Sequence, residues 1–227
     1  MNTTGKGCWW FFWLMTVGAV VAIGPIQAAT GSESPACPAA ETPVNVEVRF
    51  DSANPFIDDS RSRAWIQNKA RQLHHPVGLT ESRLAHTLTA HFEIRSTGKT
   101  QTRCIYLKSI SLVLGYPSIK IYIANAYQAG SCEYQAIHRH EVEHVRIING
   151  HQERSLPQWQ SQLQALARTI RPLPSNNPQQ AQQGILQKLD QAVRKEIQRS
   201  EKILKAQQAA IDTTQSYAKV QASCRQW

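Results

Sequence analysis

The residues best suited to chemistry lie in one short motif, His140-Glu141-Val142-Glu143-His144. On a helix, residues four positions apart lie on one face, one turn apart. Two imidazoles in that arrangement can bind one zinc ion from the same side. Glu141 can then take a proton from a water molecule at the open position of the metal. The spacing therefore predicts a metal-assisted hydrolase, with His140 and His144 as zinc ligands and Glu141 as the general base.

The segment around the motif has the features of a helix. Residues 131–149 contain neither proline nor glycine, Ser131 is a good N-cap, and Asn149-Gly150 is a common helix stop. Helical periodicity separates a charged face from an apolar stripe. The stripe consists of Ile137, His140, His144 and Ile148. Metal binding would explain why two histidines lie on the side of the helix that faces the core.

A catalytic zinc site usually has three protein ligands and one water molecule, so a third ligand is needed. His151 is the first candidate, because Gly150 could let the chain turn back toward the metal. On a continuous helix His151 would lie about 10 Å beyond His144 along the axis, so it can bind only if the helix ends. The alternative, implied by a resemblance of the motif to the gluzincin metallopeptidases, is a glutamate from a later helix. The candidates are Glu153, Glu196 and Glu201, whereas the spacing of His74, His75, His86 and His91 does not favour them.

The motif and its setting resemble the zincin metallopeptidases, in which a mixed sheet precedes an active-site helix carrying H-E-x-x-H. The sequence is similar to uncharacterised secreted bacterial zinc proteases over residues 44–151, and only the five-residue motif is specific. Glu143 departs from the zincin signature, which usually has an uncharged residue there. The resemblance implies Zn²⁺ as the cofactor, a peptide or protein as the substrate, and strand 118–124 as an edge that could pair with an extended peptide. Candidates for stabilising an oxyanion are Tyr122, Tyr127 and Tyr134.

The pattern predicts an α+β fold, with a small antiparallel or mixed sheet packed on the HExxH active-site helix and a helical C-terminal region. Strands are predicted at 44–50, 88–96, 103–114 and 118–124, with a break at 76–80 and helices at 60–73 and 157–170. The last two strands are expected to form a hairpin around residues 115–118. After a break at 171–178, residues 179–223 carry an amphipathic stripe. It could pack across the catalytic domain or form a homodimer as a short coiled coil.

The N-terminal residues are typical of an export signal. Residues 1–28 contain Lys6, an apolar run from Trp9 to Ile23, and a small residue suited to cleavage, Ala28. We therefore expect a signal peptide at 1–28, a flexible leader at 29–43, a zincin-like catalytic domain at 44–171 and a long amphipathic helical segment at 172–227. The protein would be periplasmic or secreted, with membrane contact only through the signal segment. An uncleaved anchor is the alternative.

Four cysteines remain after removal of such a signal, namely Cys37, Cys104, Cys132 and Cys224. An even number in an exported chain suggests two disulfides, for which three pairings are possible. We predict Cys104–Cys132, which would tie a strand to the start of the motif helix. The second predicted pair, Cys37–Cys224, would join the two ends of the chain. Free buried thiols are the alternative.

The charge and composition of the chain exclude one further class of function, nucleic-acid binding. The formal net charge is +9, but the basic residues form no run and do not alternate with aromatic residues, so nucleic-acid binding is not expected. Two functions remain open. The first is an exported zinc hydrolase, specifically a metallopeptidase. The second is a non-catalytic cell-envelope protein, with a structural metal site or a chance motif and a C-terminal interaction helix; such a site would tolerate glutamine at Glu141.

Overall fold

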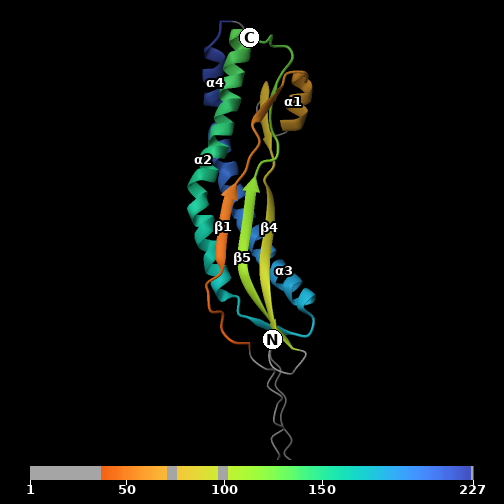
Figure 1. The fold of residues 1–227 in the computed structure, drawn as a ribbon. Coiled ribbons are helices and arrows are strands. Elements are labelled where there is room, and N and C mark those ends of the chain that lie inside the picture. Colours follow the sequence, from red (N-terminus) through yellow and green to blue (C-terminus); the bar gives the residue numbers. More distant parts are fainter. Residues whose placement is uncertain (1–36, 71–75, 97–101, 226) are drawn as a thin grey trace, which may run out of the picture. The chain divides into compact units, whose positions relative to one another are not determined.

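Strands and helices combine in an α+β architecture, as the sequence predicts (Figure 1). The computed structural model describes residues 37–70, 76–96, 102–225 and 227, which all belong to one compact unit, residues 35–227. The strands are β1 (Asn45–Phe50), β2 (Pro55–Asp58), β3 (Gly78–Ser82), β4 (Ala85–Ser96), β5 (Arg103–Gly115), β6 (Ile119–Ile123) and β7 (Leu173–Ser175). The helices are α1 (Arg63–Ala70), α2 (Cys132–Thr169), α3 (Pro178–Ala209) and α4 (Thr214–Ala222).

The strands form two sheets with matching chain order. The first sheet has the order β1-β5-β4, with the short β7 paired to β5, and the second has the order β2-β6-β3. In both sheets the first pair is parallel and the second pair is antiparallel. Because β1 leads to β2, β3 leads to β4 and β5 leads to β6, the same three segments of chain build both sheets.

The predicted hairpin of residues 103–114 and 118–124 is wrong. These segments are β5 and β6, which lie in different sheets instead of pairing with each other. Residues 115–118 have a turn-like composition, but they carry the chain from one sheet to the next. A Cβ on Gly115 would lie 1.6 Å from the backbone oxygen of Asp51, so the crossing segments approach too closely for any other residue. The predicted break at 76–80 is also wrong, because β3 begins at Gly78.

Helix α2 is much longer than predicted. The predicted stop at Asn149-Gly150 is wrong, and Pro157, which was expected to begin a separate helix, lies inside α2. At 38 residues, α2 is about 57 Å long. Its N-terminal half packs on β3 and β6, and its C-terminal half packs on β1. Burial of Trp159 and Leu163 in the C-terminal half holds the helix together beyond the glycine and the proline.

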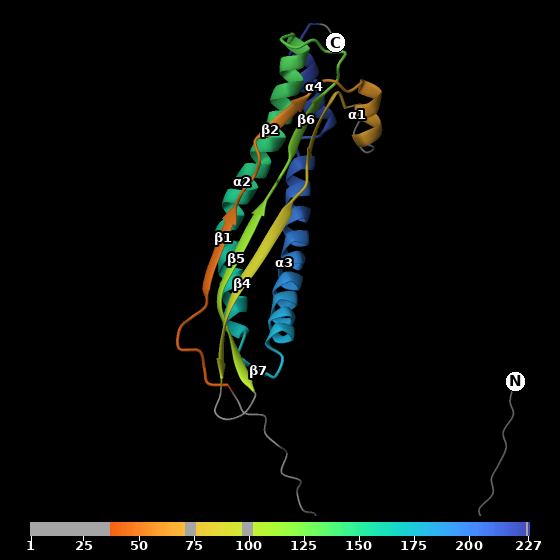
Figure 2. The ribbon, with the colours of Figure 1, turned by 45° about the vertical axis from the view of Figure 1, so that its right-hand side comes forward.

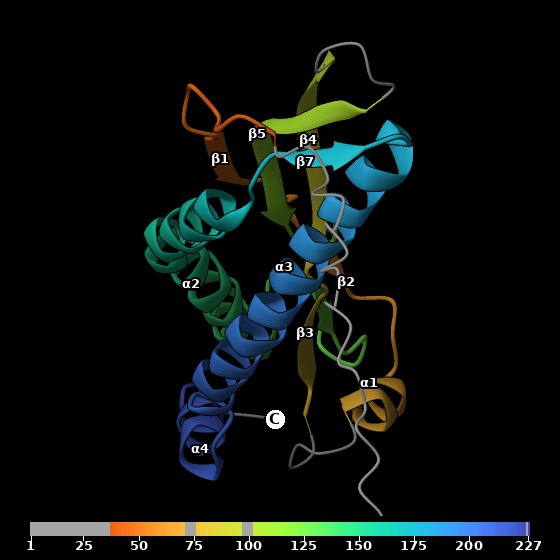
Figure 3. The same ribbon diagram turned by 90° about the horizontal axis from the view of Figure 1, so that it is seen from below.

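Helices α2 and α3 cover the same face of the first sheet (Figures 2 and 3). The main core lies between this face and the two helices. It includes Val48, Ile110, Leu112, Leu114, Trp159, Leu163, Leu189 and Val193. The predicted amphipathic C-terminal helix therefore packs on the chain's own sheet, and a homodimer through it stays a prediction. None of the described helices is both long and apolar enough to cross a membrane.

All four predicted cysteines form disulfides, but the predicted pairing is wrong. The bonds are Cys37–Cys104 and Cys132–Cys224. Cys104 is the second residue of β5, which begins at the opposite end of the fold from the start of α2, whereas α4 returns the C-terminus to that start (Figure 1). Two disulfides are typical of proteins from an oxidising, extracellular compartment. The predicted signal peptide lies outside the described residues.

Candidate metal centre

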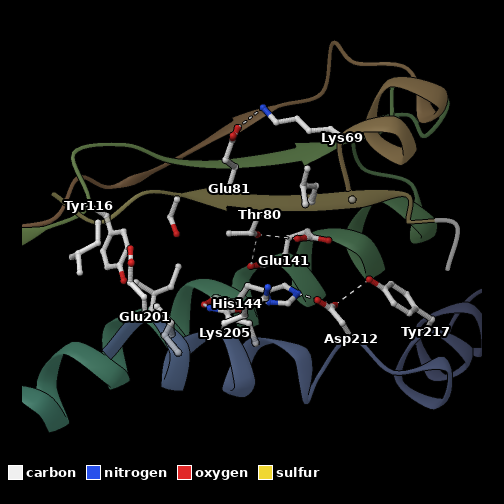
Figure 4. A pocket seen from close by; sticks show the side chains of 17 residues that line it. Lys69, Thr80, Glu81, Tyr116, Glu141, His144, Glu201, Lys205, Asp212 and Tyr217 are labelled. Carbon is white, nitrogen blue, oxygen red and sulfur yellow. Dashed lines mark hydrogen bonds and ion pairs between the residues drawn. The ribbon is translucent and has the colours of Figure 1, made fainter. Parts of the chain in front are cut away.

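Three potential ligands converge where α2 passes the short link between α3 and α4, and Figure 4 shows two of them, His144 and Asp212. Asp212 in this link has its Oδ1 3.2 Å from Nε2 of His140 and 3.1 Å from Nε2 of His144. One ligand atom from each of the three residues lies within 4.8 Å of the others. These two nitrogens and one oxygen could therefore hold a metal ion.

The prediction that His140 and His144 lie on the core-facing side of the motif helix is confirmed. His144 is 6% exposed, and the side chain of His140 is 9% exposed. The two imidazole rings lie 5.0 Å apart, on successive turns of α2. On the opposite face, Glu143 forms an ion pair with Arg146 at 3.0 Å, so this second acidic residue of the motif points away from the cluster.

His151 does not join the cluster, because α2 continues through Gly150. The imidazole Nε2 of His151 instead lies 2.8 Å from the hydroxyl of Ser200 on α3. The glutamate candidates are also placed elsewhere. Glu153 is exposed, Glu196 pairs with Arg199 at 2.9 Å, and Glu201 lines the cavity described below without joining the three ligand atoms.

Asp212 is the residue that sequence reasoning missed. It lies 68 positions after His144, and no motif spacing connects the two. Its local signal is the run Asp212-Thr213-Thr214, which interrupts the long amphipathic stretch with residues typical of a helix N-cap. Thr213 does cap α4. An acidic residue at that break could have been considered as a ligand that returns to the motif helix.

Two neighbours hold the cluster in place. The side-chain oxygen of Gln208 accepts a hydrogen bond from Nδ1 of His144, and its nitrogen donates to the backbone oxygen of His144 at 3.1 Å. A histidine whose Nδ1 donates in this way presents its Nε2 as the ligand atom. The hydroxyl of Tyr217 donates to Oδ1 of Asp212 at 3.0 Å, and the tyrosine ring lies 5.2 Å from that of His140.

Glu141 lies beside the cluster and is only 2% exposed. The hydroxyl of Thr80 on β3 donates to Oε2 of Glu141 at 2.8 Å, which fixes the carboxylate. Burial raises the pKa of Glu141, although the charges of His144 and His140 act in the opposite direction. The raised pKa makes the Glu141 carboxylate a stronger base than an exposed glutamate.

Two of the three potential ligands, His144 and Asp212, have shifted pKa values. Burial lowers the pKa of His144, but the hydrogen bond to Asp212 and the charge of Glu141 outweigh this effect and raise it overall. Burial also raises the pKa of Asp212, but hydrogen bonds from His140 and His144 hold it well below its usual value. With neutral histidines, the carboxylates of Asp212 and Glu141 would carry two negative charges in a largely buried place. A divalent cation would balance that charge.

A cavity of about 490 Å³ opens beside these residues. Glu141, His144, Asp212 and Tyr217 line it together with residues of β3 and α3 (Figure 4). Strand β3 is an edge of the second sheet, whereas β6 is its central strand. The expectation that residues 118–124 offer a free edge is therefore wrong, and β3 is the edge strand that borders the cavity.

The other candidates from the sequence lie elsewhere. Tyr122, Tyr127 and Tyr134 do not line the cavity, and the hydroxyl of Tyr122 donates to Glu81 at 3.2 Å. His86 is bound to Asp190 at 2.9 Å, and His91 is exposed. His74 and His75 lie outside the described residues. Tyr217 is the tyrosine that contacts the cluster.

Comparison with known proteins places the chain in no family. No family model matches the sequence, no curated protein matches it, and no solved structure matches the fold. Function must therefore be inferred from the residues of the site.

Gly78 on β3 offers a test of how tightly Glu141 is held. A Cβ there would lie 2.5 Å from Oε1 of Glu141 and 2.6 Å from Cγ2 of Ile137. Gly78→Ala should therefore lower the free energy of unfolding by about 1–3 kcal/mol, as overpacking usually does. Urea unfolding followed by circular dichroism would measure this change.

Gly184 on α3 gives the matched control, because a Cβ there meets no atom within 4 Å. Gly184→Ala should raise the free energy of unfolding by about 0.5–1 kcal/mol, the usual gain in a helix. Equal stability of Gly78→Ala and the wild type would show that Glu141 is not confined as described.

Proposed function

We propose that this protein is an exported zinc-dependent hydrolase, and specifically a metallopeptidase. The observation that carries the proposal is the convergence of three ligand atoms, from His140, His144 and Asp212, within 4.8 Å of one another beside the buried Glu141. A cavity of about 490 Å³ at the same place gives room for a substrate. The two disulfides support an exported protein.

The donor set fits zinc. Two imidazole nitrogens and one carboxylate oxygen are typical of catalytic zinc sites, which keep one position open for water or substrate. The hydrogen bond from His144 to Gln208 and that from Tyr217 to Asp212 are the kind of supporting contacts that orient metal ligands. Zinc held there would supply a Lewis acid that polarises a substrate carbonyl and makes water easier to deprotonate.

Glu141 would perform the proton transfers. Its carboxylate would accept a proton from the attacking water and then donate it to the departing amine. Thr80 would keep the carboxylate oriented through the 2.8 Å hydrogen bond. The raised pKa of Glu141 suits both steps, because a base with a very low pKa would accept a proton poorly.

The shape of the cavity supports an extended peptide as the substrate. Strand β3 borders the cavity, and among the described strands it pairs on one side only, with β6. A peptide could add to its free edge through backbone hydrogen bonds, which recognise an extended chain regardless of its sequence. The scissile bond would then lie in the cavity between β3 and helix α3, near Glu141.

The experiment that tests this function is cleavage of a fluorescently labelled, unfolded protein by the purified chain. We expect cleavage that a zinc chelator such as 1,10-phenanthroline abolishes and that added Zn²⁺ restores. Cleavage that is insensitive to the chelator would contradict the proposal. So would the absence of cleavage, for this substrate and for a random peptide library, by a chain that holds one zinc ion.

A further inference from the structure

The segment that carries Asp212 is only lightly packed. Helix α3 has four buried residues, and the last of them is Leu204. From Lys205 onward none of the described residues is fully buried, and α4 has no buried residue at all. Helix α4 lies against the N-terminal half of α2 (Figure 1). Apolar packing alone therefore gives little reason for α4, and for Asp212 before it, to stay in place.

A covalent bond supplies the missing attachment. The Cys132–Cys224 disulfide joins the first residue of α2 to the residues just after α4 and closes a loop of 92 positions. Cys132 lies eight positions, or about two helical turns, before His140 on the same helix. The disulfide thus fastens the segment with Asp212 and Tyr217 to the helix that carries both histidines.

We propose that this disulfide completes the metal centre, so that the site reaches full affinity only after the chain is oxidised. This inference rests on the proposed zinc site. In the closing step the thiols of Cys132 and Cys224 form the S–S bond and pass two electrons and two protons to a donor disulfide, which leaves as two thiols. In a reducing compartment, Asp212 is held beside the histidines by hydrogen bonds without the covalent bond, and it moves away from them more often. The hydrolase is then held inactive before export.

The two disulfides differ in their exposure, which makes the proposal testable. Cys132 is exposed and Cys224 is half-buried, whereas Cys104 in the other bond is only 1% exposed. A reductant in solution should therefore open Cys132–Cys224 before Cys37–Cys104, because thiol–disulfide chemistry depends on access to the sulfur. The Cys37–Cys104 bond lies at the far end of the first sheet from the cluster (Figure 1). It serves as an internal control.

The test compares the zinc affinity of three full-length chains by competition with a chromophoric chelator. They are the oxidised wild type, the double variant Cys132→Ser/Cys224→Ser, and the control Cys37→Ser/Cys104→Ser. The first double variant should bind zinc about tenfold to a hundredfold more weakly, the usual effect of losing a contact that holds a metal ligand. The control should keep the affinity of the wild type. Hydrogen exchange should rise in α4 of the first variant and not in that of the control.

If the variant Cys132→Ser/Cys224→Ser fails to fold, a second measurement uses the folded wild type instead. A water-soluble phosphine can open the exposed disulfide of the folded wild type, taking up one oxygen atom from water while two thiols form. Alkylation and peptide mass would verify that only Cys132–Cys224 is open. This chain should show the same loss of zinc affinity.

The outcomes separate the two proposals. If the oxidised wild type binds no zinc, the proposed function fails. If it binds zinc and the opened chain binds equally tightly, the proposed function stands and the role of the disulfide is overturned. An equal loss of affinity in the control variant would also overturn it, because the effect would then reflect general stability.

Discussion

Asp212→Ala should weaken zinc binding by at least about a hundredfold. Loss of contacts that merely support a ligand typically costs tenfold to a hundredfold in affinity, and loss of a ligand itself should cost no less. The carboxylate lies 3.2 Å and 3.1 Å from the two histidine nitrogens, so its removal takes away one of three ligands and one of the two negative charges of the site. Competition with a chromophoric chelator would measure the affinity.

Asp190→Ala is the matched control for this variant. Asp190 lies on α3 and is bound to His86 at 2.9 Å and to Arg194 at 2.6 Å, outside the cluster. Its replacement should leave zinc affinity within about threefold of the wild type. Asp212→Asn adds a second comparison, because the amide keeps the size of the side chain and loses its charge. Zinc affinity unchanged in both Asp212 variants would mean that the third ligand is a different residue.

Glu141→Gln should lower the turnover number for peptide cleavage by about a hundredfold to ten-thousandfold, the usual contribution of a general base. Zinc affinity should change little, because Glu141 is not among the three converging ligands. Glutamine keeps the size of the side chain and its bond to Thr80, so the fold should be preserved. Steady-state cleavage of a quenched fluorescent peptide, with the zinc content measured in the same sample, would test both statements.

Glu143→Gln controls for the loss of a carboxylate from the same motif. Glu143 lies two positions further along α2 and pairs with Arg146 on the outer face of the helix. Its replacement should leave turnover unchanged, since an exposed ion pair contributes little to stability and lies away from the cavity. Full activity of Glu141→Gln would exclude Glu141 as the general base.

The part of the site that the sequence reveals is the part fixed by local geometry. His140, Glu141 and His144 are placed by the period of a single helix, and alternation of apolar residues is enough to locate β1 and β6. Asp212 depends on the return of α3 and α4 to α2, which no local pattern encodes. The disulfide partners, and the strands with which β5 and β6 pair, could not be predicted for the same reason. Each is decided by contacts between distant segments.

The length of α2 illustrates how packing overrides local preference. Gly150 and Pro157 disfavour a continuous helix by about 1 kcal/mol and about 3 kcal/mol respectively. Full burial of a large apolar side chain contributes about 1.5–3 kcal/mol, and both Trp159 and Leu163 are 4% exposed. These opposing contributions are of similar size, so the sequence alone could not decide between one helix and two. The continuous helix is also the reason that His151 lies too far along the axis to join His144.

The most direct test of the zinc site is the metal content of the purified, oxidised chain beside that of His144→Ala, measured by mass spectrometry of the released metal. We expect one zinc ion per wild-type chain and almost none in the variant, because His144 provides one of the three converging ligand atoms. A wild-type chain that holds no zinc after incubation with excess metal would contradict the proposed centre. Equal zinc content in the two chains would contradict it as well.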